Sequence, residues 1–351
     1  MERVDNKYIN KAIDELVGFL GIKEDIPAES VLLPLQEGNT KKCIERIANH
    51  LGLPITVNLI SGESFDSCAL VTTDGSGQGE EGIAAQVSIP SYLPLYGSPE
   101  LQGFPIQIKV SGDCQRYADA FVATVAHELS HIVLHSLLHT ERNNEIYTDI
   151  AAMLLGFAMA MNRGRYTVDS NYVLGWQLTT TTRFGYMKDE QFKFALRKVR
   201  AILKSSRTDF KKMRTEIDKQ LSNCRKQLSL YRKTFEEFSK LIEYLDRNQA
   251  KKIRKEDAKK IVEIHSLNYG DRFESVLKSN EKKLRETELL YSGWFAYPQN
   301  HYSKQKLSSL EVFHNNLNGL LSSLIHESTL LKNDVALLRR CVGFFGKFKA
   351  N

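Results

Sequence analysis

Three residues of the segment VAHELSHIVLH could bind a metal and move a proton: His127, Glu128 and His131. On an α-helix, residues four apart lie about 40° apart around the axis and about 6 Å apart along it, so the two imidazoles lean toward one point. Two neutral imidazoles at that point can share a zinc ion. Glu128 then points beside the metal, where it can act as a general base on a zinc-activated water.

The helix that must carry these residues is strongly apolar. The H-E-x-x-H pattern also arises by chance, in roughly one chain of this size per hundred. Chance is the weaker explanation, because a helix that only needed to pack would gain nothing from two histidines and a glutamate in its middle. We therefore expect a helix buried beside a cleft. Its apolar positions are Phe121, Val122, Val125, Leu129, Ile132 and Val133.

The next expected helix, in the segment EIYTDIAAMLLGFAMAM, carries Glu145 and Asp149 one turn apart. The H-E-x-x-H element followed by E-x-x-x-D resembles the minimal gluzincin zinc metallopeptidases, over about residues 106–161. The resemblance implies a zincin-like fold, with Glu145 as the third zinc ligand and Asp149 as the residue that steadies a ligand histidine. Thr148 stands where that family usually has alanine. The implied function is a zinc metalloendopeptidase, with Zn²⁺ as cofactor, Glu128 as general base and a protein or peptide as substrate.

Other histidines near these motifs are expected to be structural. His135 and His139 continue the four-residue spacing, but their directions have rotated about 80° and 120° from that of His127. We interpret both as helix-end histidines, where positive charge is favoured. His326 and Glu327 begin a second H-E pair, but no histidine follows at the required place.

The segments before the zinc helices predict a small sheet with flanking helices. Helices are expected over about residues 6–20 and between Asn39 and Gly52, where apolar residues recur at helical spacing. Strands are expected in LPITVNLI, in FPIQIKV and on both sides of the segment TDGSGQGEEG, which is interpreted as a hairpin loop. In the gluzincins an edge strand holds the substrate backbone. The sequence leaves open which strand lies at the edge.

Residues 166–187 are expected to form a polar, aromatic loop before a helix that begins near Lys188. Four side chains of this loop are candidates to reach the cleft, where one of them could stabilise an oxyanion. Packing against the flank of the domain is the alternative for each. The four are Tyr172, Trp176, Arg183 and Tyr186.

From about residue 206 the chain becomes helical and heavily charged, so we expect two domains, residues 1–205 and residues 206–351. The expected fold class is α+β, followed by an all-α domain. Two apolar stripes predict an antiparallel coiled coil or helical bundle, with an intramolecular hairpin favoured over self-association or a partner protein. The first stripe is Ile217, Leu221, Cys224, Leu228, Tyr231, Phe235, Phe238, Ile242 and Leu245, and the second is Leu310, Phe313, Leu317, Leu320, Leu324 and Leu331.

The formal net charge of +6 is unevenly distributed, with 12 Lys and Arg against 21 Asp and Glu in residues 1–165 and 36 against 21 in the remainder. The stretch from Lys193 to Lys233 alone has a net charge of +11, which would suit a nucleic-acid surface. These charges fall on the solvent side of a heptad helix, and no base-reading motif accompanies them. A nucleic-acid partner is therefore not favoured.

Several features indicate a cytoplasmic protein without a membrane span. The longest apolar run, Ile150 to Met161, is too short to cross a bilayer, and the N-terminus lacks the apolar core of a signal peptide. The five cysteines are widely separated, as in proteins that keep reduced thiols. The main alternative to an enzyme is a regulatory or scaffold protein that uses a zinc-binding, peptidase-like domain for binding. The sequence does not reveal the substrate or the oligomeric state.

Overall fold

The computed structural model describes residues 5–62, 71–72, 85–111, 117–173, 176–247, 259, 269–295 and 300–346. The chain divides into two compact units. Unit 1 contains residues 1–207 together with residues 300–304, and unit 2 contains residues 208–299 and 305–351. The boundary expected after residue 205 lies next to the division after Arg207. Residues 300–304 also belong to unit 1, which the sequence did not predict.

Unit 1 begins with α1 (Asn6–Leu20), α2 (Ala28–Gln36) and α3 (Thr40–Leu51). α3 begins after Asn39, whose side chain accepts the N–H of Lys42, and ends before Gly52, whose φ of +87° favours glycine. α1 and α3 agree with the predicted helices. α2 is an element that was not predicted, and Pro34 inside it weakens the helical pattern of its sequence.

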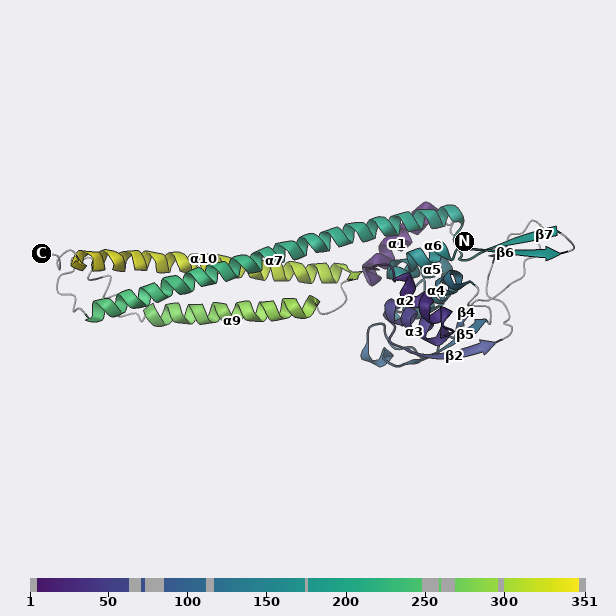
Figure 1. The fold of residues 1–351 in the computed structure, drawn as a ribbon, viewed down its shortest axis with the longest axis horizontal. Coiled ribbons are helices and arrows are strands. Elements are labelled where there is room, and N and C mark those ends of the chain that lie inside the picture. The colour runs from purple at the N-terminus through teal and green to yellow at the C-terminus, as the bar shows by residue number, and fades with distance from the viewer. Residues whose placement is uncertain are drawn as a thin grey trace. The chain divides into compact units, whose positions relative to one another are not determined.

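A three-stranded sheet lies beside the helix that carries the H-E-x-x-H element, α4 (Ala118–Ser136) (Figure 1). Its strands are β2 (Thr56–Gly62), β5 (Pro105–Ser111) and β4 (Ala85–Val87), in that order, and the short 3-10 helix η1 (Pro99–Leu101) precedes β5. β2 is parallel to β5, and β4 is antiparallel to it. Within the described ranges β4 is therefore an edge strand, and it is the strand of this sheet that packs closely against α4.

In the described residues, the two strands predicted to flank the glycine-rich segment do not pair with each other. β3 (Val71–Thr72) pairs with β7 (Trp176–Arg183), whereas β4 pairs with β5 of a different sheet. Strand propensity indicates that a segment will pair but not which partner it takes, because the partner is selected by tertiary packing. The glycine-rich segment itself lies outside the described residues.

The prediction of a loop over residues 166–187 was also wrong. β6 (Tyr166–Val173) and β7 form an antiparallel hairpin, in register from Tyr166 opposite Arg183 to Val173 opposite Trp176. The polar composition suggested a loop, but threonine, valine and tyrosine also suit a strand. Only residues 184–188 remain between this hairpin and the next helix, which begins at Asp189, close to the predicted start.

The core of unit 1 is built on α4, α5 (Glu145–Ala152) and α6 (Ala158–Arg163), with a π-helical turn, η3 (Met153–Phe157), between α5 and α6. The predicted burial of α4 is confirmed, since the side chains expected to face the core are at most 1% exposed. Gly156 of η3 has a φ of +96°, and a Cβ there would lie 2.3 Å from the carbonyl oxygen of Glu24. The backbone of η3 therefore passes very close to the segment that follows α1.

A two-stranded ribbon links residues that are far apart in the sequence. β1 (Ile22–Lys23) pairs antiparallel with β8 (His301–Tyr302). Glu24 joins three parts of unit 1: its N–H donates to the carbonyl oxygen of Asn300, and its carboxylate accepts from the hydroxyl of Tyr302 and from Nε of Arg207, each at 2.7 Å. Glu24 therefore holds both chain segments that lead into unit 2.

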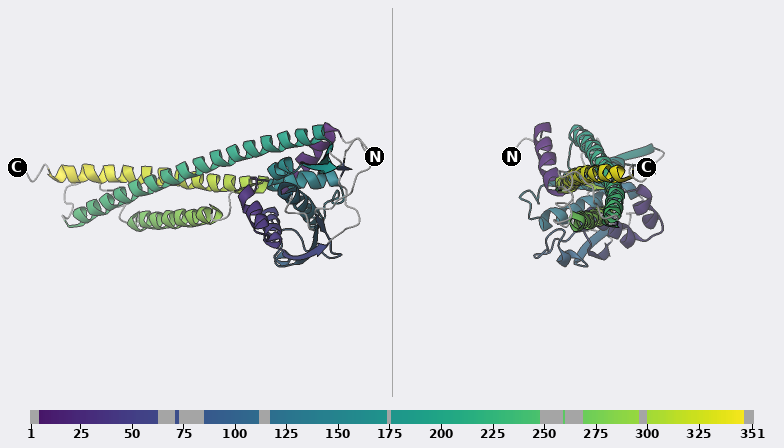
Figure 2. Two further views of the ribbon diagram at one scale, coloured as in Figure 1. Left: turned by 45° about the vertical axis from the view of Figure 1, so that its right-hand side comes forward. Right: turned by 90° about the vertical axis from the view of Figure 1, so that its left-hand side faces the viewer.

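The described residues of unit 2 lie in long helices (Figures 1 and 2). They are the part of α7 (Asp189–Arg247) that follows residue 207, α9 (Tyr269–Phe295) and α10 (Lys304–Gly346). α7 and α10 run in the same direction, because Cys224 lies opposite Leu317 and Glu237 lies opposite Arg339. No helix in the described ranges combines the length and apolar character that a membrane span requires.

α9 runs antiparallel to α7, with Arg225 opposite Glu288 and Arg232 opposite Glu281. Most of both predicted stripes is buried in two apolar clusters, to which α9 contributes Phe273, Leu284 and Tyr291. The intramolecular cover expected for the first stripe is therefore present. The two stripes are not antiparallel to each other, because α9 reverses the chain between them.

Candidate metal centre

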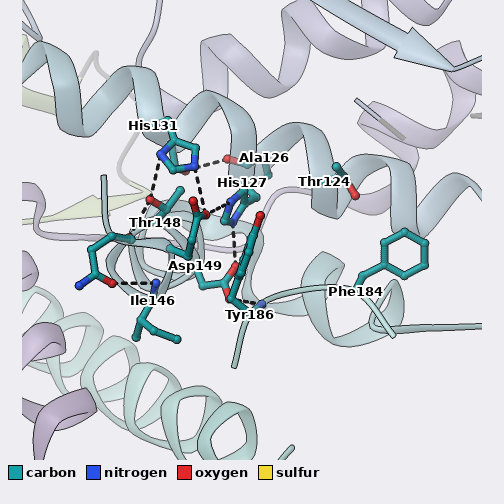
Figure 3. A network of polar contacts seen from close by, with 12 residues as sticks. Thr124, Ala126, His127, His131, Ile146, Thr148, Asp149, Phe184 and Tyr186 are labelled. Atoms are coloured by element: carbon teal, nitrogen blue, oxygen red, sulfur yellow. Dashed lines mark hydrogen bonds and ion pairs between the residues drawn. The ribbon is translucent and has the colours of Figure 1, made fainter. Parts of the chain in front are cut away.

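The side chains of His127, His131 and Glu145 converge on one point. Figure 3 shows the two histidines close together. One ligand-type atom from each residue lies within 4.8 Å of the others. Nε2 of His127 is 3.0 Å and Nε2 of His131 is 3.3 Å from the same oxygen, Oε2 of Glu145. The histidines lie on adjacent turns of α4, and Glu145 is the first residue of α5. The three predicted ligand positions are thus brought together.

Asn144 fixes the start of α5 and with it the position of Glu145. Its Oδ1 accepts the N–H of Ile146 at 3.1 Å, which caps the helix, and its Nδ2 donates to the hydroxyl of Tyr8 in α1 at 2.8 Å. The positive end of the helix dipole favours an anionic side chain at this place. α1 therefore helps to position a candidate ligand that is far away in the sequence.

Asp149 lies on the far side of His127 from the convergence point. Its Oδ1 is 2.8 Å from Nδ1 of His127, and its Oδ2 accepts the N–H of Tyr186 at 3.1 Å. The Asp149 side chain is 1% exposed. A carboxylate can only accept a hydrogen bond, so Nδ1 of His127 carries the proton that faces Asp149. In the neutral imidazole the lone pair is then on Nε2, where it can bind a metal.

Thr148 plays the corresponding part for His131. Its Oγ1 lies 3.2 Å from Nδ1 of His131 and donates to the carbonyl oxygen of Asn144 at 3.1 Å, so the hydroxyl is free to accept the imidazole proton. The carbonyl oxygen of Arg142 is 3.4 Å from the same nitrogen. Thr148 was expected only as a small residue in place of alanine, and its contact with His131 was not predicted, because its only signal in the sequence is the hydroxyl itself.

The site is strongly anionic around His127. Burial by itself would lower the pKa of His127, but hydrogen bonds to Asp149 and Glu145 and the negative charge of Asp149 and Glu128 raise it to about 10. Burial by itself would raise the pKa of Glu145, but hydrogen bonds from His127 and His131 lower it to about 2. The two shifts have the same origin, because the acidic side chains favour the protonated form of His127 and the histidines favour the ionised form of Glu145.

Glu128 lies next to the candidate ligands and points toward the edge of the sheet. Its Oε2 accepts the N–H of Val87 at 3.2 Å. The next residue, Ser88, donates its N–H to the carbonyl oxygen of Gln107 in β5 at 3.0 Å. The N–H groups of successive residues in an antiparallel strand face opposite sides, so the N–H of Val87 faces away from β5. Glu128, the expected general base, therefore contacts the outer edge of β4. The sequence did not indicate which strand forms the edge of the sheet.

Among the candidates from residues 166–187 whose side chains are described, Tyr186 reaches the site. The ring of Tyr186 stacks on His127 with centroids 5.2 Å apart and an interplanar angle of 25°. Arg183 lies in β7 opposite Tyr166. The side chains of Tyr172 and Trp176 lie outside the described residues.

The additional histidines do not join the cluster. Nε2 of His135 is 2.9 Å from Oδ1 of Asn143. His139 lies beyond the end of α4 and is buried, with Nε2 3.4 Å from Oε1 of Glu15, so its interpretation as a helix-end histidine was wrong. The direction of the chain after Ser136 depends on tertiary contacts, which is why helical extrapolation failed. His326 and Glu327 lie in α10, where Glu327 pairs with Arg272.

The donor set fits a divalent transition metal. Two imidazoles and one carboxylate suit such an ion, and the second nitrogen of each imidazole already has an acceptor on the protein. Three protein ligands would leave a coordination position for water or substrate, as in catalytic rather than structural sites. No protein-family model, curated protein or solved structure matches the chain. The functional proposal is therefore based on the residues of the chain itself.

Proposed function

We propose that this chain is a zinc-dependent peptidase. The observation that carries the proposal is the convergence of His127, His131 and Glu145 at one point, with Glu128 beside them at the outer edge of β4. Zinc at this point would supply Lewis-acid chemistry, by lowering the pKa of a water molecule and polarising a carbonyl group. The resemblance to the minimal gluzincins supports the same assignment.

The role of each residue follows from its contacts. Asp149 and Thr148 contact the Nδ1 atoms of His127 and His131, so that both Nε2 atoms would be available to hold a zinc ion. Glu128 accepts a proton from the attacking water and returns it to the leaving amine. The outward-facing backbone groups of β4 bind an extended peptide by strand addition. When a peptide pairs with this edge of β4, Glu128 loses its hydrogen bond with the N–H of Val87.

The decisive experiment compares wild-type protein with Glu128→Gln. Both are loaded with zinc and incubated with a proteome-derived peptide library, and new peptide termini are counted by mass spectrometry. We expect equal zinc content and new termini in the wild-type sample alone, because an amide cannot act as the base. Glu190→Gln, which changes an exposed glutamate in α7, is the matched control and should cleave like wild type. Equal cleavage by Glu128→Gln would contradict the mechanism.

One observation favours a second candidate, a regulatory or scaffold protein with a metal-bearing domain. Glu128 is only 7% exposed and is engaged by Val87, whereas a general base must meet water. This candidate predicts stoichiometric zinc and no new termini with the wild-type protein. A nucleic-acid partner gains no such support, because Arg225 and Arg232 of the basic stretch pair with Glu288 and Glu281 inside unit 2.

A further inference from the structure

Tyr186 contacts both members of the buried His127 and Asp149 pair. Its ring stacks on the imidazole at 5.2 Å, and its backbone N–H donates to Oδ2 of Asp149 at 3.1 Å (Figure 3). Asp149 therefore has one carboxylate oxygen on His127 and the other on the backbone that carries the stacked ring. Tyr186 thus restrains His127 in two ways. Its ring lies against one face of the imidazole, and its N–H holds the Asp149 carboxylate that contacts Nδ1.

The backbone before Tyr186 allows this close approach. Gly185 has a φ of +90°, which disfavours any other residue. A Cβ at Gly185 would lie 3.4 Å from a guanidinium nitrogen of Arg165 and 3.5 Å from Oδ2 of Asp149. These are ordinary van der Waals distances, so the positive φ, and not a lack of space, is what favours glycine next to Asp149.

Arg165 holds the loop on both sides of Tyr186. It is 5% exposed and donates to the carbonyl oxygens of Phe184 and Met187 and, at 2.9 Å, to Oδ1 of Asp189. Its guanidinium also lies 4.2 Å from the centroid of the Phe192 ring. A buried arginine with this many acceptors is a rigid anchor, so the position of Tyr186 is set before any metal binds.

We propose that Tyr186 is a positioning residue of the metal site, an inference that rests on the metal-binding part of the proposed function. Stacking of its ring restrains rotation of His127 and keeps Nε2 directed at the convergence point. Its N–H keeps Asp149 turned toward Nδ1. The proposal assigns the effect on metal affinity to the ring, through its stacking on His127.

Metal affinity tests this role without any need for turnover. The dissociation constant for Zn²⁺ is measured by competition with a chromophoric chelator for wild type, Tyr186→Ala and Tyr186→Phe. We expect Tyr186→Ala to raise the constant by about tenfold and Tyr186→Phe to stay within about twofold, since the loss of a supporting contact usually costs 10 to 100-fold. Tyr92→Ala is the matched control, because it removes a tyrosine side chain that is 70% exposed.

A spectroscopic signature separates positioning from general destabilisation. In wild type and Tyr186→Phe, the stacked ring should shift the imidazole proton resonances of His127 upfield, and Tyr186→Ala should lose that shift while His131 keeps its own resonances. Tyr186→Leu, which keeps apolar bulk without a π face, should behave like the alanine variant. Unchanged zinc affinity and unchanged His127 resonances in Tyr186→Ala would overturn the proposal. A wild-type protein that binds zinc but cleaves no peptide would remove the peptidase proposal alone.

Discussion

Nδ1 of His127 and Oδ1 of Asp149 lie 2.8 Å apart, although the two residues belong to different helices. The contact is buried, and in a low-dielectric setting a hydrogen bond to a carboxylate is stronger than in water. It therefore links the geometry of α5 to the orientation of a candidate ligand on α4.

Asp149→Ala is expected to weaken zinc binding by about 10 to 100-fold, the usual cost of losing a partner of a ligand histidine. Glu145→Ala removes a ligand and should lose zinc outright at the same metal concentration. Competition with a chelator measures both constants. Asp119→Ala, which breaks an exposed pair with Arg163, is the control and should bind zinc like wild type. A larger loss in Asp149→Ala than in Glu145→Ala would exchange the two roles.

Zinc binding should release a proton at neutral pH. Without metal, the hydrogen bond to Asp149 helps to raise the pKa of His127 to about 10, so the ring is protonated and a metal must displace the proton. Affinity should therefore rise with pH until about pH 10. Calorimetry in buffers of different ionisation enthalpy measures the released proton. A pH-independent dissociation constant would contradict the assignment.

The same raised pKa makes a prediction for the metal-free protein. The folded-state pKa of His127, about 10, lies above the unfolded value of 6.5, so the stabilising contribution is complete below pH 6.5 and is lost as pH rises to about 10. The melting temperature of metal-free wild type should fall across this window. Asp149→Asn, in which the hydrogen-bonding carboxylate is absent, should show a flatter profile.

Gly156→Ala should destabilise unit 1 by about 2 to 4 kcal/mol, in the range of severe backbone clashes. The added Cβ would lie 2.3 Å from the carbonyl oxygen of Glu24 and 2.4 Å from Nε2 of His50, and the φ of +96° is itself unfavourable for alanine. Chemical denaturation measures the change. Gly319→Ala in α10 meets no atom within 4 Å and should instead stabilise by about 0.5 to 1 kcal/mol.

Leu324→Asp should disrupt the helical packing of unit 2 and leave zinc binding intact. Leu324 is fully buried between the helices, where an unpaired carboxylate is costly. Circular dichroism should show loss of helix at a lower temperature than in wild type. Leu289→Asp changes a leucine that is 71% exposed and should melt like wild type. Loss of zinc from Leu324→Asp would show that the metal site depends on unit 2.

Residues 300–304 should be needed for full stability of unit 1. A chain that ends at residue 207 lacks β8 and the Tyr302 hydrogen bond to Glu24. A second chain joins Arg207 to Asn300 by about six Gly/Ser residues, a span that a flexible linker covers, and ends at residue 304. We expect the second chain to melt at a higher temperature than the first. Equal melting temperatures would show that the β1–β8 ribbon contributes nothing to unit 1.

The sequence predicted the parts of the fold that depend on local pattern. The resemblance to the minimal gluzincins supplied Glu145 as the third member of the cluster. Helical periodicity identified α1, α3 and α4, Asn39 and Gly52 marked the ends of α3, and the spacing of His127 and His131 predicted that these two side chains converge. These features are readable because one turn of helix fixes both the direction and the distance of side chains.

Contacts between distant segments were not predictable in the same way. The stacking of Tyr186 on His127 needs a hairpin whose polar residues suggested a loop. The pairing of β1 with β8 joins two-residue strands, which are too short for a periodic pattern. The hydroxyl of Thr148 was visible in the sequence, but its contact with His131 depends on how α5 packs against α4.

The pairing of β1 with β8 has a consequence for how the chain folds as it is synthesised. N-terminal domains generally fold first, as soon as their own residues have left the ribosome. Here β1 emerges early, whereas its partner strand and Tyr302 follow α7 and α9. A nascent chain can therefore complete unit 1 only after α7 and α9 have been made. The last stabilising contacts of unit 1 form only when β8 has been synthesised.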